Sequence, residues 1–485
     1  MSDCSVQNIP AVQANVGEVN PQYRLNYHLM GERGWINDPN GFIFYDGKFH
    51  LFYQHNPYDS VWGPMHWGHA VSADLVSWEY LPIALTPDMP YDKDGCFSGS
   101  AIEKDGKLYL IYTGHVTKPS EGGIDFVQQQ CVAVSNDAIT FHKLAQNPVV
   151  RTEDIPNLAS KRDFRDPKVN FINGEYFMVL GSNDGAGRGQ ALLYTSADLI
   201  HWRFRNILAK SDGTLGDNWE CPDLFPSGNS FVFMVSPQNV DPDVYQNTNT
   251  SVCMVGDLDV ENGTFISKYA CRMDYGFDFY APQSTVDSNG RRIVVAWMNA
   301  WGSENPTHTL RHGWAGAMTL PREVVIRRGS ICFQPISEIE QYRRNPFTMR
   351  AFELEGTVSL PVGGDSYELV LSLEPKDAAE VGLKLRVGDG EETLIYYVSN
   401  ESTVVFDRNQ SGIGPKGVAR APVKLDNGSL TLRVFVDRCS VEVFLGEGET
   451  VMTGLIYPSE QSTGIESFAK GTAFVRDLRK WDLKI

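Results

Sequence analysis

The sequence lacks long apolar runs, and this absence excludes integral membrane proteins with helical spans. None of the 485 residues falls in a stretch approaching the roughly 18 consecutive apolar residues of a transmembrane helix, so we expect no membrane span. The start, MSDCSVQNIPAVQ, also lacks the basic and then apolar segments of a secretion signal. We therefore expect a cytoplasmic protein, or a secreted one whose leader has been removed.

Positive charge is scarce relative to negative charge. The chain has 42 Lys and Arg against 60 Asp and Glu, which gives a formal net charge of -18. Such a surface repels nucleic acid and anionic membranes, so we expect neither as a partner. It is compatible with a small neutral substrate.

Motifs for metals, nucleotides and serine hydrolysis are also missing. Ser98 lacks the frame of a nucleophile elbow, and the glycines show neither phosphate-loop nor dinucleotide spacing. His66 and His69 flank Trp67, but no third ligand stands at a useful spacing for zinc. We therefore expect neither a metal nor an organic cofactor. The cysteines form no Cys-x-x-Cys pair and are expected to be free thiols: Cys4, Cys96, Cys131, Cys221, Cys253, Cys271, Cys332 and Cys439.

Long helical periodicity is almost absent, and a repeat of short strands takes its place. Five strings (NDPNG, CFSGS, FRDPKV, ECPDLF and FYAPQS) recur at intervals of 56 to 68 residues. A polar turn and an apolar strand follow each string, and a further strand comes later in each unit. For the fifth unit we expect that later strand in WAGAMTLPREVVI. Five such units predict a five-bladed β-propeller.

The alternation changes after residue 336, where no further string occurs. We predict an all-β chain in which the propeller is followed by a C-terminal β-sandwich. The expected segments are an N-terminal extension (1–24), the propeller (25–336), a linker (337–349) and the sandwich (350–485).

Radial symmetry would bring the strings together around one end of the central channel. Asp38, Asp166 and Glu220 would then converge, and two facing carboxylates can cleave a glycosidic bond. WINDPNG has the composition of a tight turn, whose donors should favour an ionised Asp38. Arg165 should keep Asp166 charged, whereas Trp219 and Cys221 offer Glu220 an apolar setting that favours protonation.

Aromatic side chains surround these strings, as a sugar-binding pocket requires. Packing in the hydrophobic core explains any one of them equally well. The aromatic residues are Trp35, Trp62, Trp67, Phe97, Tyr280, Trp297 and Trp301.

WINDPNG, FRDPKV and WECPDLF, in this order, resemble the signatures of glycoside hydrolase family 32, the β-fructofuranosidases. The resemblance extends through YQHNP, DGCFSGSA, DFYAPQ and DRCSVEVF, and is closest to bacterial-type sucrose and sucrose-6-phosphate hydrolases. It implies a propeller with a β-sandwich and a retaining double displacement. Asp38 would be the nucleophile, Glu220 the acid and base, and Asp166 the transition-state stabiliser. The candidate substrate-binding residues are Trp35, Asn37, Gln54, Trp62, Phe97, Ser98, Arg165, Cys221, Tyr280 and Trp297.

Several alternatives remain open at this point. The chain could transfer fructosyl groups to sugars, act on sucrose 6-phosphate, bind sugars without catalysis, or be an inverting glycosidase acting on pentosides. A phosphate pocket would need basic residues, for which Arg311 and His312 are candidates. Chain-length preference is open, and a homo-oligomer is possible.

Overall fold

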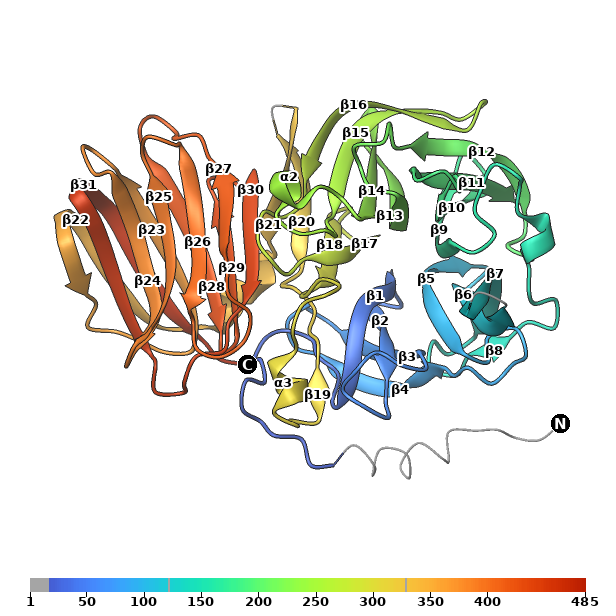
Figure 1. Cartoon of the computed structure of the whole chain (residues 1–485), viewed down its shortest axis with the longest axis horizontal. Coiled ribbons are helices and arrows are strands. Elements are labelled where there is room, and N and C mark those ends of the chain that lie inside the picture. The colour runs from blue at the N-terminus through green and yellow to red at the C-terminus, as the bar shows by residue number, and fades with distance from the viewer. Residues whose placement is uncertain (1–16, 121–122, 328) are drawn as a thin grey trace.

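The computed structural model describes residues 17–120, 123–327 and 329–485. It consists of two β domains side by side, a ring of sheets and a stack of long strands (Figure 1). The predicted all-β fold, a five-bladed propeller followed by a sandwich, is confirmed. No helix in the described ranges is long and apolar enough to cross a bilayer.

The propeller blades are antiparallel sheets whose first strands contact one another around the central channel. Short helices lie in the connecting loops: η2 (Thr152–Asp154), α2 (Pro242–Tyr245) and α3 (Pro306–Thr309). Blades one to three contain β1 (Gly34–Tyr45), β2 (Lys48–Asn56), β3 (His66–Ser72), β4 (Glu79–Leu85); β5 (Gly95–Lys104), β6 (Lys107–Ser120), β7 (Gly123–Ser135), β8 (His142–Lys143); and β9 (Phe164–Ile172), β10 (Glu175–Asn183), β11 (Gly189–Ser196), β12 (Arg203–Lys210). Blades four and five contain β13 (Asn218–Ser227), β14 (Ser230–Gln238), β15 (Val252–Asp259), β16 (Thr264–Arg272); and β17 (Tyr280–Val286), β18 (Arg292–Trp297), β20 (Arg322–Arg327), β21 (Ser330–Pro335).

The stretch expected to supply the later strand of the fifth blade divides between two blades. Its start forms β19 (Trp314–Ala315), which pairs in parallel with β1 of the first blade. Only its end, from Arg322, forms β20 of the fifth blade. The expectation was therefore half wrong, because the chain crosses to the neighbouring blade before it returns. This crossing ties the last blade to the first.

WINDPNG does not form the expected turn. It lies within β1, and the turn comes later, at Asp46 and Gly47. The pairing of β1 with β2 is interrupted on both sides of Pro39 and Asn40. A proline cannot donate to the ladder, and the Asn40 side chain bonds Asp38 O and Gly99 N instead. The specialised residues therefore build a bulge, which redirects side chains without reversing the chain.

The first strand of every blade has such an irregularity at its string. In three blades the residue before proline has a positive φ: 64° at Asp166, 46° at Cys221 and 53° at Ala281. This conformation is uncommon for residues other than glycine, and it tends to occur at functional sites. The repeat in the sequence is thus a repeat of bulges around the channel.

The second domain is one antiparallel, nearly closed sheet with a fully buried apolar core. Its longest strand, β31, pairs with β24 in its first half and with β23 in its second, and so joins the two sides. The strands are β22 (Arg343–Ser359), β23 (Ser366–Glu374), β24 (Glu380–Gly388), β25 (Glu391–Val398), β26 (Thr403–Gln410), β27 (Val418–Pro422), β28 (Leu430–Asp437), β29 (Ser440–Leu445), β30 (Thr450–Leu455) and β31 (Gly464–Leu483).

The expected linker (337–349) is shorter than the sequence suggested. Its first part is the 3₁₀ helix η3 (Ser337–Tyr342), and residues 343–349 already belong to β22. The expected N-terminal extension lies outside the described residues over 1–16. Seven cysteines are free thiols, and Cys4 also lies outside the described part.

A buried ionic network joins the two domains. His28, ahead of the first blade, contacts Asp437 at 2.8 Å and Glu442 at 2.9 Å, both in the second domain. Arg322 of the propeller bridges Glu442 at 2.7 Å and Asp274 at 2.9 Å. All these side chains are at most 2% exposed. Pairing of each charge makes their burial tolerable, and loss of one partner would leave an uncompensated charge.

This network predicts a loss of stability at alkaline pH. Burial opposes the charge of His28, but hydrogen bonds to Asp437 and Glu442 outweigh it and raise the pKa to about 9, from 6.5. The stabilisation from protonated His28 is complete below the pKa of histidine in the unfolded chain, 6.5. It is lost as the pH rises through the folded-state pKa of about 9. We expect the free energy of unfolding to fall by roughly 3 kcal/mol between pH 6 and pH 10 from this group.

Urea unfolding of the whole chain across this pH range measures the effect. The His28→Gln variant should be less stable at pH 6 and should show a shallower decline. Equal declines in the variant and the unchanged protein would contradict the assignment to His28.

Candidate active site

Three carboxylates from three blades meet at the channel mouth beside one thiol. Asp38 lies in β1, Asp166 in β9 and Glu220 in β13, and all are buried. Cys221 Sγ lies 3.5 Å from Asp38 Oδ2 and 3.6 Å from Asp166 Oδ2. The backbone N–H of Cys221 donates to Asp166 Oδ2 at 3.0 Å. The structure thus brings together the carboxylates that the repeat had predicted to converge.

The Asp38 carboxylate is held by side chains on both oxygens. Ser98 Oγ donates to Oδ2 at 2.7 Å, and Asn37 Nδ2 donates to Oδ1 at 3.0 Å. Trp35 Nε1 donates to Asn37 Oδ1 at 2.7 Å and thereby orients the amide. Burial, and then the charge of Glu220, raise the pKa of Asp38 despite these donors. Of the donors expected from the sequence only Asn37 reaches the carboxylate, because Asn40 bonds the Asp38 backbone oxygen, and burial outweighs the donors that are present.

Asp166 is not paired with Arg165 as its position in the sequence suggested. The Arg165 guanidinium donates to Glu220 Oε1 at 3.0 Å and to Asp163 Oδ1 at 2.8 Å. Burial and the charge of Glu220 raise the pKa of Asp166 more than Arg165 lowers it. The expectation that Arg165 keeps Asp166 charged is therefore wrong, because the positive φ of Asp166 turns the two neighbouring side chains toward different partners.

Glu220 does not lie in the apolar setting that its neighbours suggested. Tyr280 OH donates to Oε2 at 2.7 Å, while Arg165 Nε reaches Oε1 at 3.0 Å. Trp219 points to the other face of β13 and packs against Phe233 in the core. Neighbours in a strand face opposite sides, which explains the difference. Both Glu220 oxygens are thus fixed by donors.

The cluster carries more negative charge than Arg165 can balance. Mutual repulsion in a buried site favours keeping a proton among the three carboxylates, and that proton belongs to the group as a whole. Burial also raises the pKa of the Cys221 thiol, as do the charges of Asp166 and Asp38, so the thiol remains a donor. A buried set with ionised and protonated members can supply both a nucleophile and an acid.

An aromatic wall stands beside the carboxylates. Trp35, Tyr280 and Trp297 form a buried cluster with Cys221, and the rings of Trp35 and Trp297 lie 5.7 Å apart. Phe97 packs against this cluster, and Trp62 meets Phe97 edge to face at 5.9 Å.

The remaining candidates are placed by separate contacts. Gln54 Nε2 donates to Cys96 O at 3.0 Å, just before Phe97. Among the other aromatics, Trp301 packs against Trp297 at 5.0 Å, and Trp67 packs on Phe52 in the core.

Two residues that support the site were missed in the sequence. Asp163 accepts from Arg165, and Gln128 Oε1 accepts from Arg165 Nη1 at 3.2 Å. Asp163 stands two residues before Arg165, on the same face of the chain, which is a signal that could have been read. Gln128 comes from β7 of another blade, and nothing in its surrounding sequence marks it.

The residues considered for binding phosphate or zinc do not form such sites. His312 is buried against Tyr23, at a ring distance of 5.9 Å, and so is unavailable to a phosphate, while Arg311 is exposed. His66 bonds Pro64 O, and His69 stacks on Phe52. Across the described ranges, no group of three His, Cys, Asp or Glu side chains could hold a metal ion.

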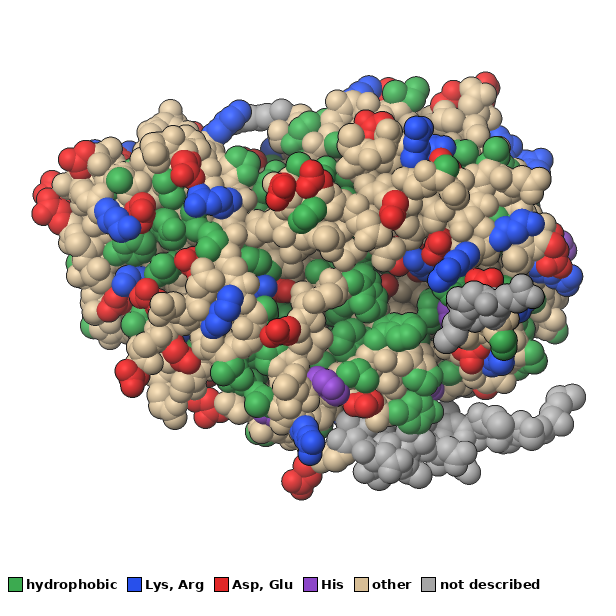
Figure 2. Space-filling model, in the orientation of Figure 1, with side chains coloured by type: hydrophobic (Ala, Val, Ile, Leu, Met, Phe, Trp, Pro, Cys, Tyr) green, Lys and Arg blue, Asp and Glu red, His purple; other side chains and the backbone are tan. Residues whose placement is uncertain are grey.

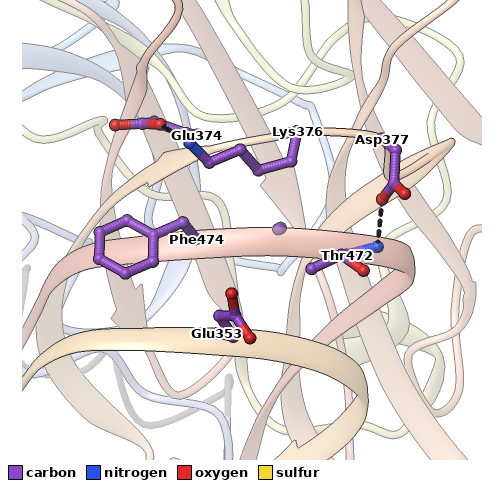
Figure 3. A pocket seen from close by; sticks show the side chains of 7 residues that line it. Glu353, Glu374, Lys376, Asp377, Thr472 and Phe474 are labelled. Atoms are coloured by element: carbon purple, nitrogen blue, oxygen red, sulfur yellow. Dashed lines mark hydrogen bonds and ion pairs between the residues drawn. The ribbon is translucent and has the colours of Figure 1, made fainter.

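The surface has hollows in both domains. Figure 2 shows one at the centre of the propeller, with hydrophobic side chains gathered along its lower rim. Another lies open on the second domain, around Phe474 (Figure 3). There Lys376 pairs with Glu374, and Asp377 accepts from Thr472 N at 2.7 Å, so these three charged groups already have partners. The carboxylate cluster lies in the propeller, and the chemistry belongs there.

Comparison with known proteins agrees with this geometry. Residues 28–335 match the model of the glycosyl hydrolases family 32 N-terminal domain, and residues 338–482 match the family 32 C-terminal model. The chain is 38% identical to the raffinose invertase of Escherichia coli, over 94% of each chain. It is 37% identical to a sucrose-6-phosphate hydrolase of Zymomonas mobilis, over 94% of this chain and 92% of that one.

A solved structure gives the same result in three dimensions. The family 32 β-fructofuranosidase of Bombyx mori is 33% identical, with a TM-score of 0.87 over 100% of this chain and 99% of that one. A mutant of that enzyme in complex with sucrose gives a TM-score of 0.85 at 34% identity, over 98% of this chain and 97% of that one. The chain belongs to glycoside hydrolase family 32.

Proposed function

We propose that this β-fructofuranosidase hydrolyses sucrose through a covalent fructosyl-enzyme, with Asp38 as nucleophile and Glu220 as acid and base. The observation that carries the proposal is the meeting of Asp38, Asp166 and Glu220 around Cys221. The invertase and sucrose-6-phosphate hydrolase names of its relatives, and the Bombyx mori complex with sucrose, support the substrate.

In the first step Asp38 attacks the anomeric carbon of the fructosyl unit. The bond to the glucosyl oxygen breaks, and Glu220 gives its proton to that oxygen. Ser98 and Asn37 hold the Asp38 oxygens, so that attack requires little reorganisation. In the second step water attacks the same carbon, its proton returns to Glu220, and Asp38 is released.

Glu220 has the contacts that a group alternating between acid and base requires. Tyr280 and Arg165 hold its two oxygens, so the carboxylate formed by the first step is stabilised by a neutral donor and a cation. We assign Asp166 to binding fructose hydroxyls, since the Cys221 N–H holds its carboxylate and the Cys221 thiol contacts both Asp166 and Asp38. The aromatic wall of Trp35 and Trp297 would exclude water from this pocket.

Sucrose 6-phosphate is the second candidate substrate, because several relatives have that activity in their names. Specificity constants for sucrose, sucrose 6-phosphate, an inulin-type oligomer and a levan-type oligomer separate the possibilities. Counting free glucose and free fructose together also separates hydrolysis from transfer, because transfer releases less fructose than glucose.

The roles of Asp38 and Glu220 predict different responses to the leaving group. Both Asp38→Asn and Glu220→Gln should lower kcat on sucrose by roughly a thousandfold or more. With β-fructofuranosyl fluoride, whose leaving group needs no proton, Glu220→Gln should show a rapid stoichiometric burst of fluoride. Asp38→Asn should show no burst.

Stopped-flow fluoride detection on both variants makes this comparison, after circular dichroism has shown that each is folded. A burst with Asp38→Asn, or sucrose turnover at the unmutated rate by either variant, would refute the assignments.

The thiol between the carboxylates predicts a shift in the pH profile. Cys221 lowers the pKa of Asp38 by donating to Oδ2, although burial raises that pKa overall. Cys221→Ala removes this donor, so Asp38 should titrate at higher pH. Since attack requires ionised Asp38, the acidic limb of kcat/KM should move to higher pH, and Cys221→Ser should restore part of the shift. Profiles on sucrose test this, and an acidic limb that stays in place or moves to lower pH would contradict it.

A further inference from the structure

Trp62 projects from a loop at the mouth of the site, between β2 and β3. Its side chain is 48% exposed, although one edge of the indole packs against Phe97. We call residues 57–65 the Trp62 loop. Asn56 supports the start of this loop, accepting from Tyr58 N at 3.0 Å and donating to Val61 O at 2.9 Å. An exposed indole beside a sugar-cleaving site offers a flat apolar surface for a second sugar ring.

A second loop from the fifth blade reaches the Trp62 loop. Residues 298–313, here called the α3 loop, contain Trp301, which packs against Trp297 of the aromatic wall. On the same loop, His308 Nδ1 lies 2.8 Å from Ser60 Oγ. This hydrogen bond joins the first and fifth blades directly at the mouth of the site.

The contact between the loops is supported on both sides. Ser60 is buried, and its N–H donates to Asp59 Oδ1 at 2.7 Å, an atom that is 4.0 Å from His308 Nδ1. Pro306 and Thr307 of α3 are buried, so the His308 backbone starts from a fixed position. The end of the loop is held by Met65, whose carbonyl accepts from Cys96 N at 2.8 Å. His308 therefore adds an anchor at Ser60, between the two ends and two residues from Trp62.

The second domain packs against the other side of the α3 loop. Gly414 lies so close that a Cβ there would come within 2.8 Å of Pro306 Cγ and of the Tyr457 ring. Contacts thus run continuously from the second domain through α3 to Ser60 and the Trp62 loop. The second domain can therefore affect the site through these contacts, although it contributes no catalytic residue.

We propose that the hydrogen bond between His308 and Ser60 positions Trp62 for recognition of the leaving sugar. The inference rests on the proposed function, because it concerns the glucosyl half of the same substrate. A long loop loses conformational entropy when it is ordered, and a bond made before binding removes part of that cost from substrate recognition. The fructosyl half is bound by the inner strands and does not depend on it.

Substrates with and without a sugar leaving group test this role in the full-length chain. For Ser60→Ala and His308→Ala, kcat/KM on sucrose should fall about three- to tenfold through KM, with kcat unchanged. On β-fructofuranosyl fluoride, which has no leaving sugar, neither variant should differ from the unmutated protein. The double variant should be no worse than either single one, as expected for two ends of one bond.

Matched controls separate positioning from general damage. His201→Ala removes an exposed histidine on the third blade that is bonded to Asp198. It should leave kcat/KM unchanged on both substrates. In Gly414→Ala the added methyl group presses on Pro306 from the second domain. This variant should raise KM for sucrose in the same way as His308→Ala.

The proposal would be overturned if Ser60→Ala and His308→Ala lost kcat/KM equally on sucrose and on the fluoride, or left KM for sucrose unchanged. Strictly additive losses of kcat/KM in the double variant would also overturn it. Failure of the proposed function itself would look different. The unmutated protein would then turn over neither sucrose nor the fluoride.

Discussion

Burial of three carboxylates beside a single guanidinium is the constraint on which the structure depends. Asp38, Asp166 and Glu220 repel one another, and Arg165 directs its charge to Glu220. No flexible loop would hold such groups together, because they would separate to reach water. The rigid ring of blades prevents that separation. The buried ionic network around His28 and Arg322 stabilises the ring by joining it to the second domain.

The recurrent bulge connects this electrostatic constraint to the sequence. In an unbroken strand, alternate side chains would face into the blade; the bulges at Asp166 and Cys221 turn carboxylate and thiol toward the channel. Proline after each of these residues interrupts the ladder at the same place. The backbone strain is local, and each blade supplies a stiff support for it.

Much of this arrangement could be predicted from the residues alone. The recurring strings and their spacing predicted the blades, and symmetry predicted the meeting of Asp38, Asp166 and Glu220. The sequence did not reveal that WINDPNG is a bulged strand, because turns and bulges use the same residues. It misled on Arg165, whose partners Glu220 and Gln128 come from other blades, and on Glu220, because Trp219 faces the other side of β13. Gln128 and the contact of His308 with Ser60 depend on packing between blades, which no local pattern encodes.

The central claim is that Asp38 forms a bond to the fructosyl unit, and trapping that bond tests it most directly. The Glu220→Gln protein would be mixed with β-fructofuranosyl fluoride, quenched in acid, digested and analysed by mass spectrometry. We predict one added fructosyl group, carried by Asp38. A label on another carboxylate, or fluoride release without any covalent adduct, would contradict the double displacement on which this account rests.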